Sequence, residues 1–142
     1  MKILGIDMGE KRIGLAVSDP LGITAQGLKT IQLDNPEEIY DKILNIVKEK
    51  NIQLIVFGLP RNMNGTLGPK AQKVQEQAKI IQEKSNLPID FEDERLSTVS
   101  AQQVLLMADQ SRAKRKKAVD RLSAVIILQS YLDRKNYLKK ER

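Results

Sequence analysis

The sequence predicts an α/β protein with a mixed five-stranded sheet flanked by helices. The first third of the chain alternates large and small residues between turn signals, and the remainder alternates helical patterns with short apolar runs. An antiparallel three-strand meander followed by helix–strand crossovers produces such a mixed sheet. The chain has 142 residues, of which 41% are hydrophobic and 30% charged, so we expect one domain over residues 1–142.

Three strands are expected before the first helix. Residues 3–7 form an apolar run that stops at an acid, and residues 13–18 alternate bulky and small side chains. The turn signal at 19–22 leads to a third strand at 28–33.

Helices and strands alternate in the middle of the chain. Asn35 followed by Pro36 and two glutamates is typical of a helix start. Residues 54–57 are all apolar and predict a strand buried on both faces. The glycine- and proline-containing segment 58–69 is expected to be a loop, and a helix with apolar positions at helical spacing follows it.

The last third is expected to contain one strand and two helices. The strand is placed at 88–94, and Ser97 is expected to cap a helix that ends near residue 107. The final helix is predicted to follow a basic run at 112–117, and the tail 135–142 to be its frayed end. The core-facing positions of the final helix are expected to be Val119, Leu122 and Ile126.

Three acidic residues fall where a strand ends or a helix begins: Asp7, Glu94 and Asp120. The strands that end near Asp7 and Glu94 should run parallel, so these acids share the edge of the sheet at which ligands bind. Asp120, at a helix start, can be presented to the same edge. Asp19 ends a strand of opposite direction and is expected at the other edge.

Only one of Asp93 and Glu94 can face the site, because neighbouring side chains of a strand point to opposite faces. Glu94 shares its face with the acids at positions 90 and 92, whereas Asp93 shares its face with apolar neighbours. This alternation favours Glu94, and Asp93 is the alternative.

The chain contains no histidine and no cysteine, which narrows the chemistry of such a site. A cysteine nucleophile and a serine–histidine pair are excluded. A metal would be a hard cation held by oxygen, Mg²⁺ or Mn²⁺.

The net charge of +6 favours a nucleic acid as partner. Aromatic residues are only 4% of the chain, so recognition should depend on backbone charge and shape more than on base stacking. The residues expected to contact nucleic acid are Lys11, Arg12, Asn62, Arg112, Lys114, Arg115, Lys116 and Lys117.

No signal peptide or membrane-spanning run is visible in the sequence. We therefore expect a cytoplasmic protein with no membrane partner. We also expect a monomer or a weak dimer.

Four ordered motifs between residues 2 and 132 carry a resemblance to a known family. They are Gly5-Ile6-Asp7-Met8-Gly9 with residues 11–19; Gly58-Leu59-Pro60 with Asn62, Gly65 and Gly68; Asp93-Glu94-Arg95-Leu96-Ser97-Thr98; and Lys117-Ala118-Val119-Asp120 with Ser123-Ala124. With these motifs the chain resembles the YqgF/RuvX family of pre-16S rRNA nucleases and Holliday junction resolvase-like proteins. The resemblance implies a ribonuclease H-like fold and a metal-dependent nuclease that matures the 5′ end of 16S rRNA, free or in a ribosomal precursor particle. It also implies hydrolysis of phosphodiester bonds with two cations about 3.5–4 Å apart, which activate the attacking water and neutralise the leaving oxygen. Asp7, at the end of a central strand, is then expected to be the shared metal ligand, with Glu94 and Asp120 on either side.

Two other functions stay open at this point. The first is a Holliday junction resolvase that acts on branched DNA with the same carboxylates. The second is a non-catalytic transcription antitermination or ribosome-associated factor, for which replacement of Asp7 by asparagine would leave activity in cells intact.

Overall fold

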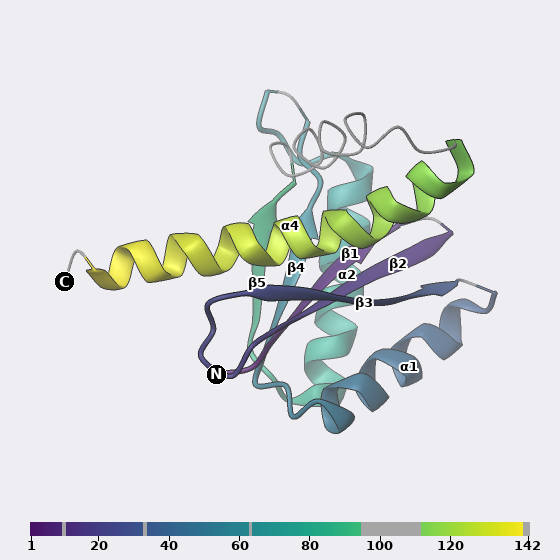
Figure 1. The fold of residues 1–142 in the computed structure, drawn as a ribbon. Helices are drawn as coiled ribbons and strands as arrows, with labels where there is room; N and C mark the ends of the chain where they lie inside the picture. Colours follow the sequence, from purple (N-terminus) through teal and green to yellow (C-terminus); the bar gives the residue numbers. More distant parts are fainter. Residues whose placement is uncertain (10, 33, 63, 95–111, 141–142) are drawn as a thin grey trace.

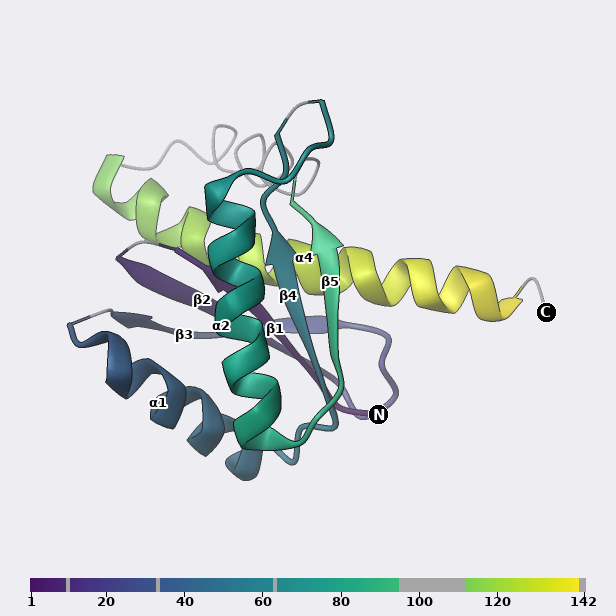
Figure 2. The same ribbon diagram turned by 180° about the vertical axis from the view of Figure 1, so that it is seen from behind.

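The computed structural model describes residues 1–9, 11–32, 34–62, 64–94 and 112–140. These residues form one sheet with helices on both of its faces (Figure 1; seen from behind in Figure 2). In chain order the elements are β1 (Ile3–Met8), β2 (Arg12–Ser18), β3 (Ala25–Gln32), α1 (Pro36–Glu49), β4 (Leu54–Leu59), α2 (Pro69–Ser85), β5 (Ile89–Asp93) and α4 (Arg112–Lys140).

The sheet has five strands in the order β3-β2-β1-β4-β5. β1 pairs antiparallel with β2, and β2 pairs antiparallel with β3, which confirms the predicted meander. β4 runs parallel to β1, and β5 runs parallel to β4. The carboxyl ends of β1, β4 and β5 therefore meet at one edge of the sheet, which we call the carboxyl edge.

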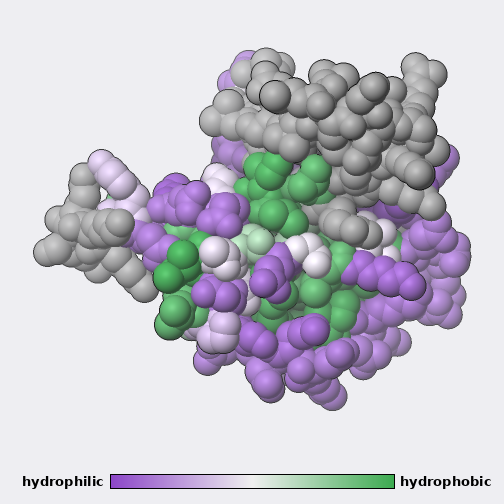
Figure 3. Space-filling model, viewed as in Figure 1, coloured by the Kyte–Doolittle hydropathy of each residue, from purple (hydrophilic) through white to green (hydrophobic). Residues whose placement is uncertain are grey.

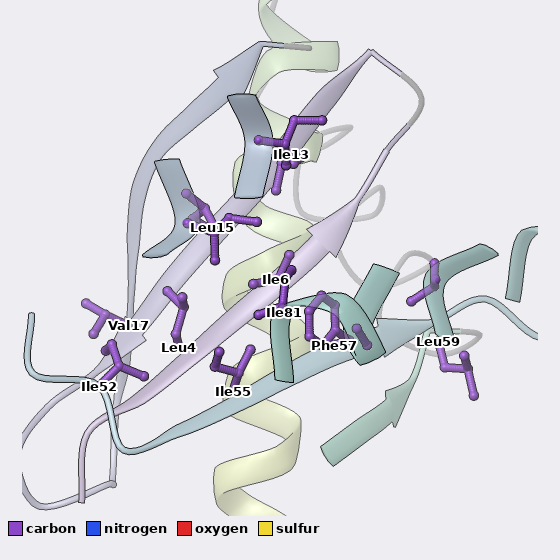
Figure 4. Packing of buried hydrophobic residues seen from close by; sticks show 14 of the residues in the cluster. Leu4, Ile6, Ile13, Leu15, Val17, Ile52, Ile55, Phe57, Leu59 and Ile81 are labelled. Atoms are coloured by element: carbon purple, nitrogen blue, oxygen red, sulfur yellow. The ribbon is translucent and has the colours of Figure 1, made fainter. Parts of the chain in front are cut away.

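One face of the sheet is covered by α1 and α2. Alternate residues of β1 and β4 point into this layer, among them Leu4, Ile6 and Phe57, none of which is exposed to solvent. The helices contribute Ile43 and Ile81 to the same cluster. Figure 4 shows how the strand residues and Ile81 pack together. The burial of these apolar side chains is the main stabilising contribution on this face.

The other face of the sheet is covered by α4. The buried residues of this second cluster include Ala16, Val56, Ile127 and Leu128. A β-carbon at Gly5 would lie 2.8 Å from Leu128 Cβ, so the helix backbone approaches β1 as closely as a glycine allows. The small residues Ser123 and Ala124 are buried there. In the coloured part of the surface seen from this side, apolar residues lie in the middle and hydrophilic residues along the lower and right-hand margin (Figure 3).

The structure corrects the predicted position and face of the last helix. α4 begins at Arg112, so the basic run forms its first turns and does not precede it. Leu122 and Ile126 are only half-buried. The core side is instead made by Ala124, Ile127, Leu128, Tyr131 and Leu132. The predicted face is therefore displaced by about one residue, and the side chain of Val119 lies outside the described part of the chain.

Two further expectations can be compared with the structure. The third strand begins at Ala25 and not at residue 28. The helix continues to Lys140, so the tail is helical for most of the segment that was expected to fray. The helix predicted from Ser97 to residue 107 lies outside the described residues. None of the helices within the described ranges, α4 included, is apolar enough over a sufficient length to cross a membrane.

Candidate active site at the carboxyl edge of the sheet

Asp7 lies near the end of the central strand β1, on the face covered by α4. Its neighbour Ile6 belongs to the core under α1 and α2, so strand alternation turns Asp7 to the other face. Asp7 is half-buried and pairs across the sheet with Gly14, which has no side chain to cover it. A carboxylate is thus fixed by regular backbone pairing where the strand reaches the carboxyl edge.

Glu94 follows β5 directly and extends over the neighbouring strand. Its backbone N–H donates a hydrogen bond of 3.2 Å to the carbonyl oxygen of Leu59, which continues the parallel pairing of β4 and β5. A β-carbon at Gly58 would lie 2.5 Å from Glu94 Oε1. The carboxyl group of Glu94 therefore lies above β4, on the way from β5 to β1.

The side chains of Glu94 and Asp7 meet in a hydrogen bond. Burial of the Glu94 carboxyl, together with this bond and the charge of Asp7, raises the pKa of Glu94 to about 9. At neutral pH Glu94 is therefore protonated in the metal-free protein, and its hydroxyl donates to the carboxylate of Asp7. Asp7 of β1 and Glu94, which follows β5, thus share one proton at this site.

The structure places Glu94, and not Asp93, on the same face as Asp7. Along β5 the acids at 90 and 92 also point toward α4: Asp90 Oδ2 accepts a hydrogen bond of 2.8 Å from the Tyr131 hydroxyl, and Glu92 Oε2 accepts one of 2.8 Å from Arg134 Nη2. Phe91 packs on the opposite face, within 6.2 Å of Phe57 between ring centroids. Alternation therefore turns Asp93 toward the α2 side of the sheet.

The third predicted acid, Asp120, belongs to α4, and its side chain lies outside the described part of the chain. Its position precedes Ile127 by seven residues, which is about two helical turns. Figure 1 shows the N-terminal part of α4 near the end of the sheet where β1 passes into β2. Among the side chains that the structure describes, no group of three acids could hold a metal ion.

Asp19 lies at the opposite edge of the sheet, as predicted. It follows β2, which runs antiparallel to β1, and its Oδ1 accepts hydrogen bonds from the backbone N–H of Ile23 at 2.7 Å and of Thr24 at 2.9 Å. These bonds, that from Thr24 first, hold the pKa of Asp19 below its usual value. Asp19 thus organises the turn between β2 and β3.

Three of the predicted nucleic-acid contacts lie at the carboxyl edge. Lys11 is exposed in the bend after β1, and Arg12 is the half-buried first residue of β2. Asn62 is exposed in the loop after β4, where its Nδ2 donates a hydrogen bond of 3.1 Å to Thr66 Oγ1. A bridge between Arg61 and Leu67 closes this loop, so it is a structured turn and not a loose connection.

The other five candidates occupy the first turns of α4. They are Arg112, Lys114, Arg115, Lys116 and Lys117, and their side chains lie outside the described residues.

Sequence reasoning missed the part that Gly58 plays at this site, because it assigned the residue to the loop. The structure shows Gly58 inside β4. A glycine that follows a fully apolar strand run could have indicated a close approach by another group. The polar contacts of Tyr131 and Arg134 with β5 were also missed, since no local pattern links residues about 40 positions apart.

A family model described as "RuvX: Holliday junction resolvase" matches residues 1–134. A protein of Clostridium botulinum (strain Eklund 17B / Type B), named "Putative pre-16S rRNA nuclease", is 51% identical over 134 residues, which are 94% of this chain and 98% of the relative. A protein of the same name from Clostridium kluyveri is 54% identical over 134 residues, with the same coverage of 94% and 98%.

Solved structures of resolvases share the fold. RuvC of T. thermophilus in complex with a Holliday junction substrate has a TM-score of 0.57 at 16% identity, covering 95% of this chain and 96% of RuvC. The Holliday junction resolvase of fowlpox virus has a TM-score of 0.57 at 16% identity, covering 94% of this chain and 99% of that protein. These likenesses show the ribonuclease H-like fold that the sequence predicts.

Proposed function

Because the chain belongs to the RuvX family, we propose that it is a metal-dependent nuclease that hydrolyses RNA phosphodiester bonds during maturation of the 5′ end of pre-16S rRNA. The observation that carries this proposal is the pairing of Asp7 with Glu94 at the carboxyl edge of the sheet. The relatives named as pre-16S rRNA nucleases support the choice of substrate.

The acid pair fits a hard divalent cation. Two carboxyl groups converge in a partly buried position, and in the metal-free protein only a shared proton relieves their repulsion. A cation that replaced this proton would satisfy both carboxylates and the preference of Mg²⁺ or Mn²⁺ for oxygen ligands. Thus Asp7 and Glu94 fit the metal chemistry that the family implies.

A third ligand is proposed from α4. Position 120 is spaced from Ser123, Ala124 and Ile127 by three, four and seven residues, and all three are buried toward the sheet. These spacings put position 120 on the same side of the helix. We assign Asp120 to the metal site, opposite Glu94 and beside Asp7.

Each residue then has a separate role in hydrolysis. Divalent cations at the site would activate the attacking water and neutralise the leaving oxygen. Asp7 holds the centre of the site, because the regular pairing of β1 with β2 and β4 fixes its backbone. Glu94, at the end of β5, and Asp120, in α4, would supply further carboxylate ligands to the cations. Lys11, Arg12 and Asn62 lie where they can orient the phosphate backbone at the same edge.

A Holliday junction resolvase is the second candidate function. It is favoured by the shared fold with T. thermophilus RuvC and fowlpox virus resolvase, whose substrate is the four-way junction. The same carboxylates could cleave either backbone, so the difference would lie in how the basic surface fits the substrate. For the RNA substrate we place the reaction in the cytoplasm, carried out by a monomer or a weak dimer.

The test is a cleavage comparison with purified protein in Mg²⁺ or Mn²⁺. The substrates are a 5′-extended 16S precursor fragment and a four-way DNA junction of equal length, each with and without EDTA. We expect EDTA-sensitive cleavage of the RNA and little cleavage of the junction. Preferential cleavage of the junction would support the resolvase, and binding without cleavage of either substrate would contradict a nuclease.

A further inference from the structure

Gly58 occupies a position of β4 at which any added side chain would displace its neighbours. The residue is buried and pairs with Glu92 of β5. A β-carbon there would lie 2.5 Å from Glu94 Oε1, 2.9 Å from Glu94 Cγ and 2.5 Å from Ile127 Cδ1. Two side chains therefore occupy the space above this glycine: Glu94, which follows β5, and Ile127 of α4.

The strand order explains why Glu94 needs this space. β4 lies between β1 and β5, so Glu94 must cross β4 to reach Asp7. Adjacent strands are about 4.8 Å apart, so β5 and β1 are about 9.6 Å apart with β4 between them. The side chains of Glu94 and Asp7 can meet across this distance only if Glu94 lies flat over β4. A side chain on the α4 face of β4 would obstruct this path. Gly58 leaves the path open, and Ile127 covers it from the side of α4.

We propose that Gly58 is a positioning residue of the metal site, because the absence of a side chain at this position leaves the space in which Glu94 extends to Asp7. The inference rests on the proposed function and extends it to a residue without functional groups. Gly58→Ala would push the Glu94 carboxyl away from Asp7 and leave the site without one of its metal ligands, although every acid remains in the sequence.

A purely structural role for Gly58 is the competing explanation. The same β-carbon would meet Ile127, so Gly58→Ala could act by displacing α4. Gly5 offers a matched control, since it lies in β1 on the same face and its β-carbon would meet Leu128 Cβ at 2.8 Å, with no acid among its near contacts. Ile127→Val offers a second control, because valine lacks the Cδ1 atom that a β-carbon at position 58 would meet.

The experiment measures Mn²⁺ binding by calorimetry and the rise in Tm on addition of Mn²⁺. The proteins are the wild type, Gly58→Ala, Gly5→Ala, Ile127→Val and Gly58→Ala combined with Ile127→Val. We expect Gly58→Ala to weaken Mn²⁺ binding at least about tenfold, as the loss of groups that orient metal ligands commonly does. We expect the double variant to regain Tm without regaining Mn²⁺ affinity. Gly5→Ala should lower Tm and keep the Mn²⁺ affinity of the wild type.

Three results would overturn the inference. They are wild-type Mn²⁺ affinity in Gly58→Ala, recovery of affinity in the double variant, and an equal loss of affinity in Gly5→Ala. Failure of the proposed function gives a different result: the wild type binds Mn²⁺ and Gly58→Ala does not, yet neither protein cleaves RNA. If Gly58→Ala does not fold, the double variant, relieved of the contact with Ile127, decides the matter alone.

Discussion

At the residue scale, a shared proton relieves the repulsion between the carboxyl groups of Glu94 and Asp7, and we propose that a divalent cation takes its place. Asp7 lies on β1 and Glu94 directly follows β5, and the two meet because Glu94 lies flat over Gly58. The burial that raises the pKa of Glu94 to about 9 also makes it energetically unfavourable for both carboxyl groups to be ionised at once. A divalent cation resolves this conflict better than a proton does, since it interacts with both carboxylates at once.

The raised pKa of Glu94 predicts how the stability of the metal-free protein depends on pH. In the unfolded chain the pKa of this group is near its ordinary value of 4.5, and in the folded protein it is about 9. The folded state therefore binds the proton more tightly, and the resulting stability is fully present below pH 4.5 and is lost as pH rises through 9. In Glu94→Gln the neutral amide does not titrate. We expect its Tm, measured in EDTA, to exceed that of the wild type increasingly from pH 5 to pH 9.

The control for this prediction is Glu83→Gln, which neutralises an exposed carboxylate on α2. Its Tm should follow that of the wild type across the same range. Parallel profiles for the wild type and Glu94→Gln would mean that Glu94 is ionised in the folded protein. They would contradict the shared proton between Glu94 and Asp7.

At the scale of elements, strands were easier to predict than helix faces. The alternation along 89–94 correctly separates the acids that face α4 from the residues that face α2, because a strand has only two faces. A helix, in contrast, can turn any side toward the sheet. The apolar residues at 122 and 126 of α4 fit helical spacing as well as the residues that are in fact buried, such as Ile127 and Leu128. Which face is buried is decided by Gly5, over which Leu128 packs, and a single sequence does not reveal that contact.

The length of α4 was underestimated for a related reason. Its C-terminal turns carry charges that suggest a solvated end, but Arg134 pairs with Glu92 at 2.8 Å and Asn136 Nδ2 donates a hydrogen bond of 3.2 Å to the carbonyl oxygen of Gly22. These contacts join residues that are 42 and 114 positions apart. Tertiary contacts of this kind, and not local pattern, extend the helix.

The packing of α2 on the sheet gives a prediction at the element scale. Ile81 is fully buried, whereas its neighbour Ile80 is exposed, with a relative solvent accessibility of 36%. We expect Ile81→Ala to lower the free energy of unfolding by about 2–5 kcal/mol, because it removes buried carbon and leaves a cavity. Ile80→Ala should lower it by less than about 1 kcal/mol. Urea unfolding measures both, and equal losses would contradict the assigned face of α2.

At the scale of the whole molecule, the proposed function predicts that a polyanion binds to the basic residues of α4. The net charge is +6, and the basic run lies in α4, the helix that also contains position 120. α1 lies on the opposite face of the sheet (Figures 1 and 2) and carries the exposed Lys42 and Lys48. Substitution of two lysines on α4, compared with substitution of two lysines on α1, therefore tests whether nucleic acid binds at one surface or is attracted only by the net charge of the protein.

We expect Lys114→Ala combined with Lys116→Ala to weaken binding of the RNA precursor. The slope of log K against log salt concentration should become shallower by about 1.5, because two phosphate contacts are lost. Lys42→Ala combined with Lys48→Ala removes the same net charge and should leave the affinity and the slope close to those of the wild type. Binding isotherms over a salt series measure both. Equal effects of the two pairs would contradict a binding surface on α4.

The most direct test of the proposed site compares two aspartates at opposite edges of the sheet. The measurement is the rate at which Asp7→Asn and Asp19→Asn cleave the 5′-extended 16S precursor in Mg²⁺, with circular dichroism to verify folding. The proposed site predicts that Asp7→Asn is folded but inactive. It predicts the wild-type rate for Asp19→Asn wherever this variant is folded, since Asp19 organises only a turn. Undiminished cleavage by Asp7→Asn would contradict a metal nuclease centred on the carboxyl edge.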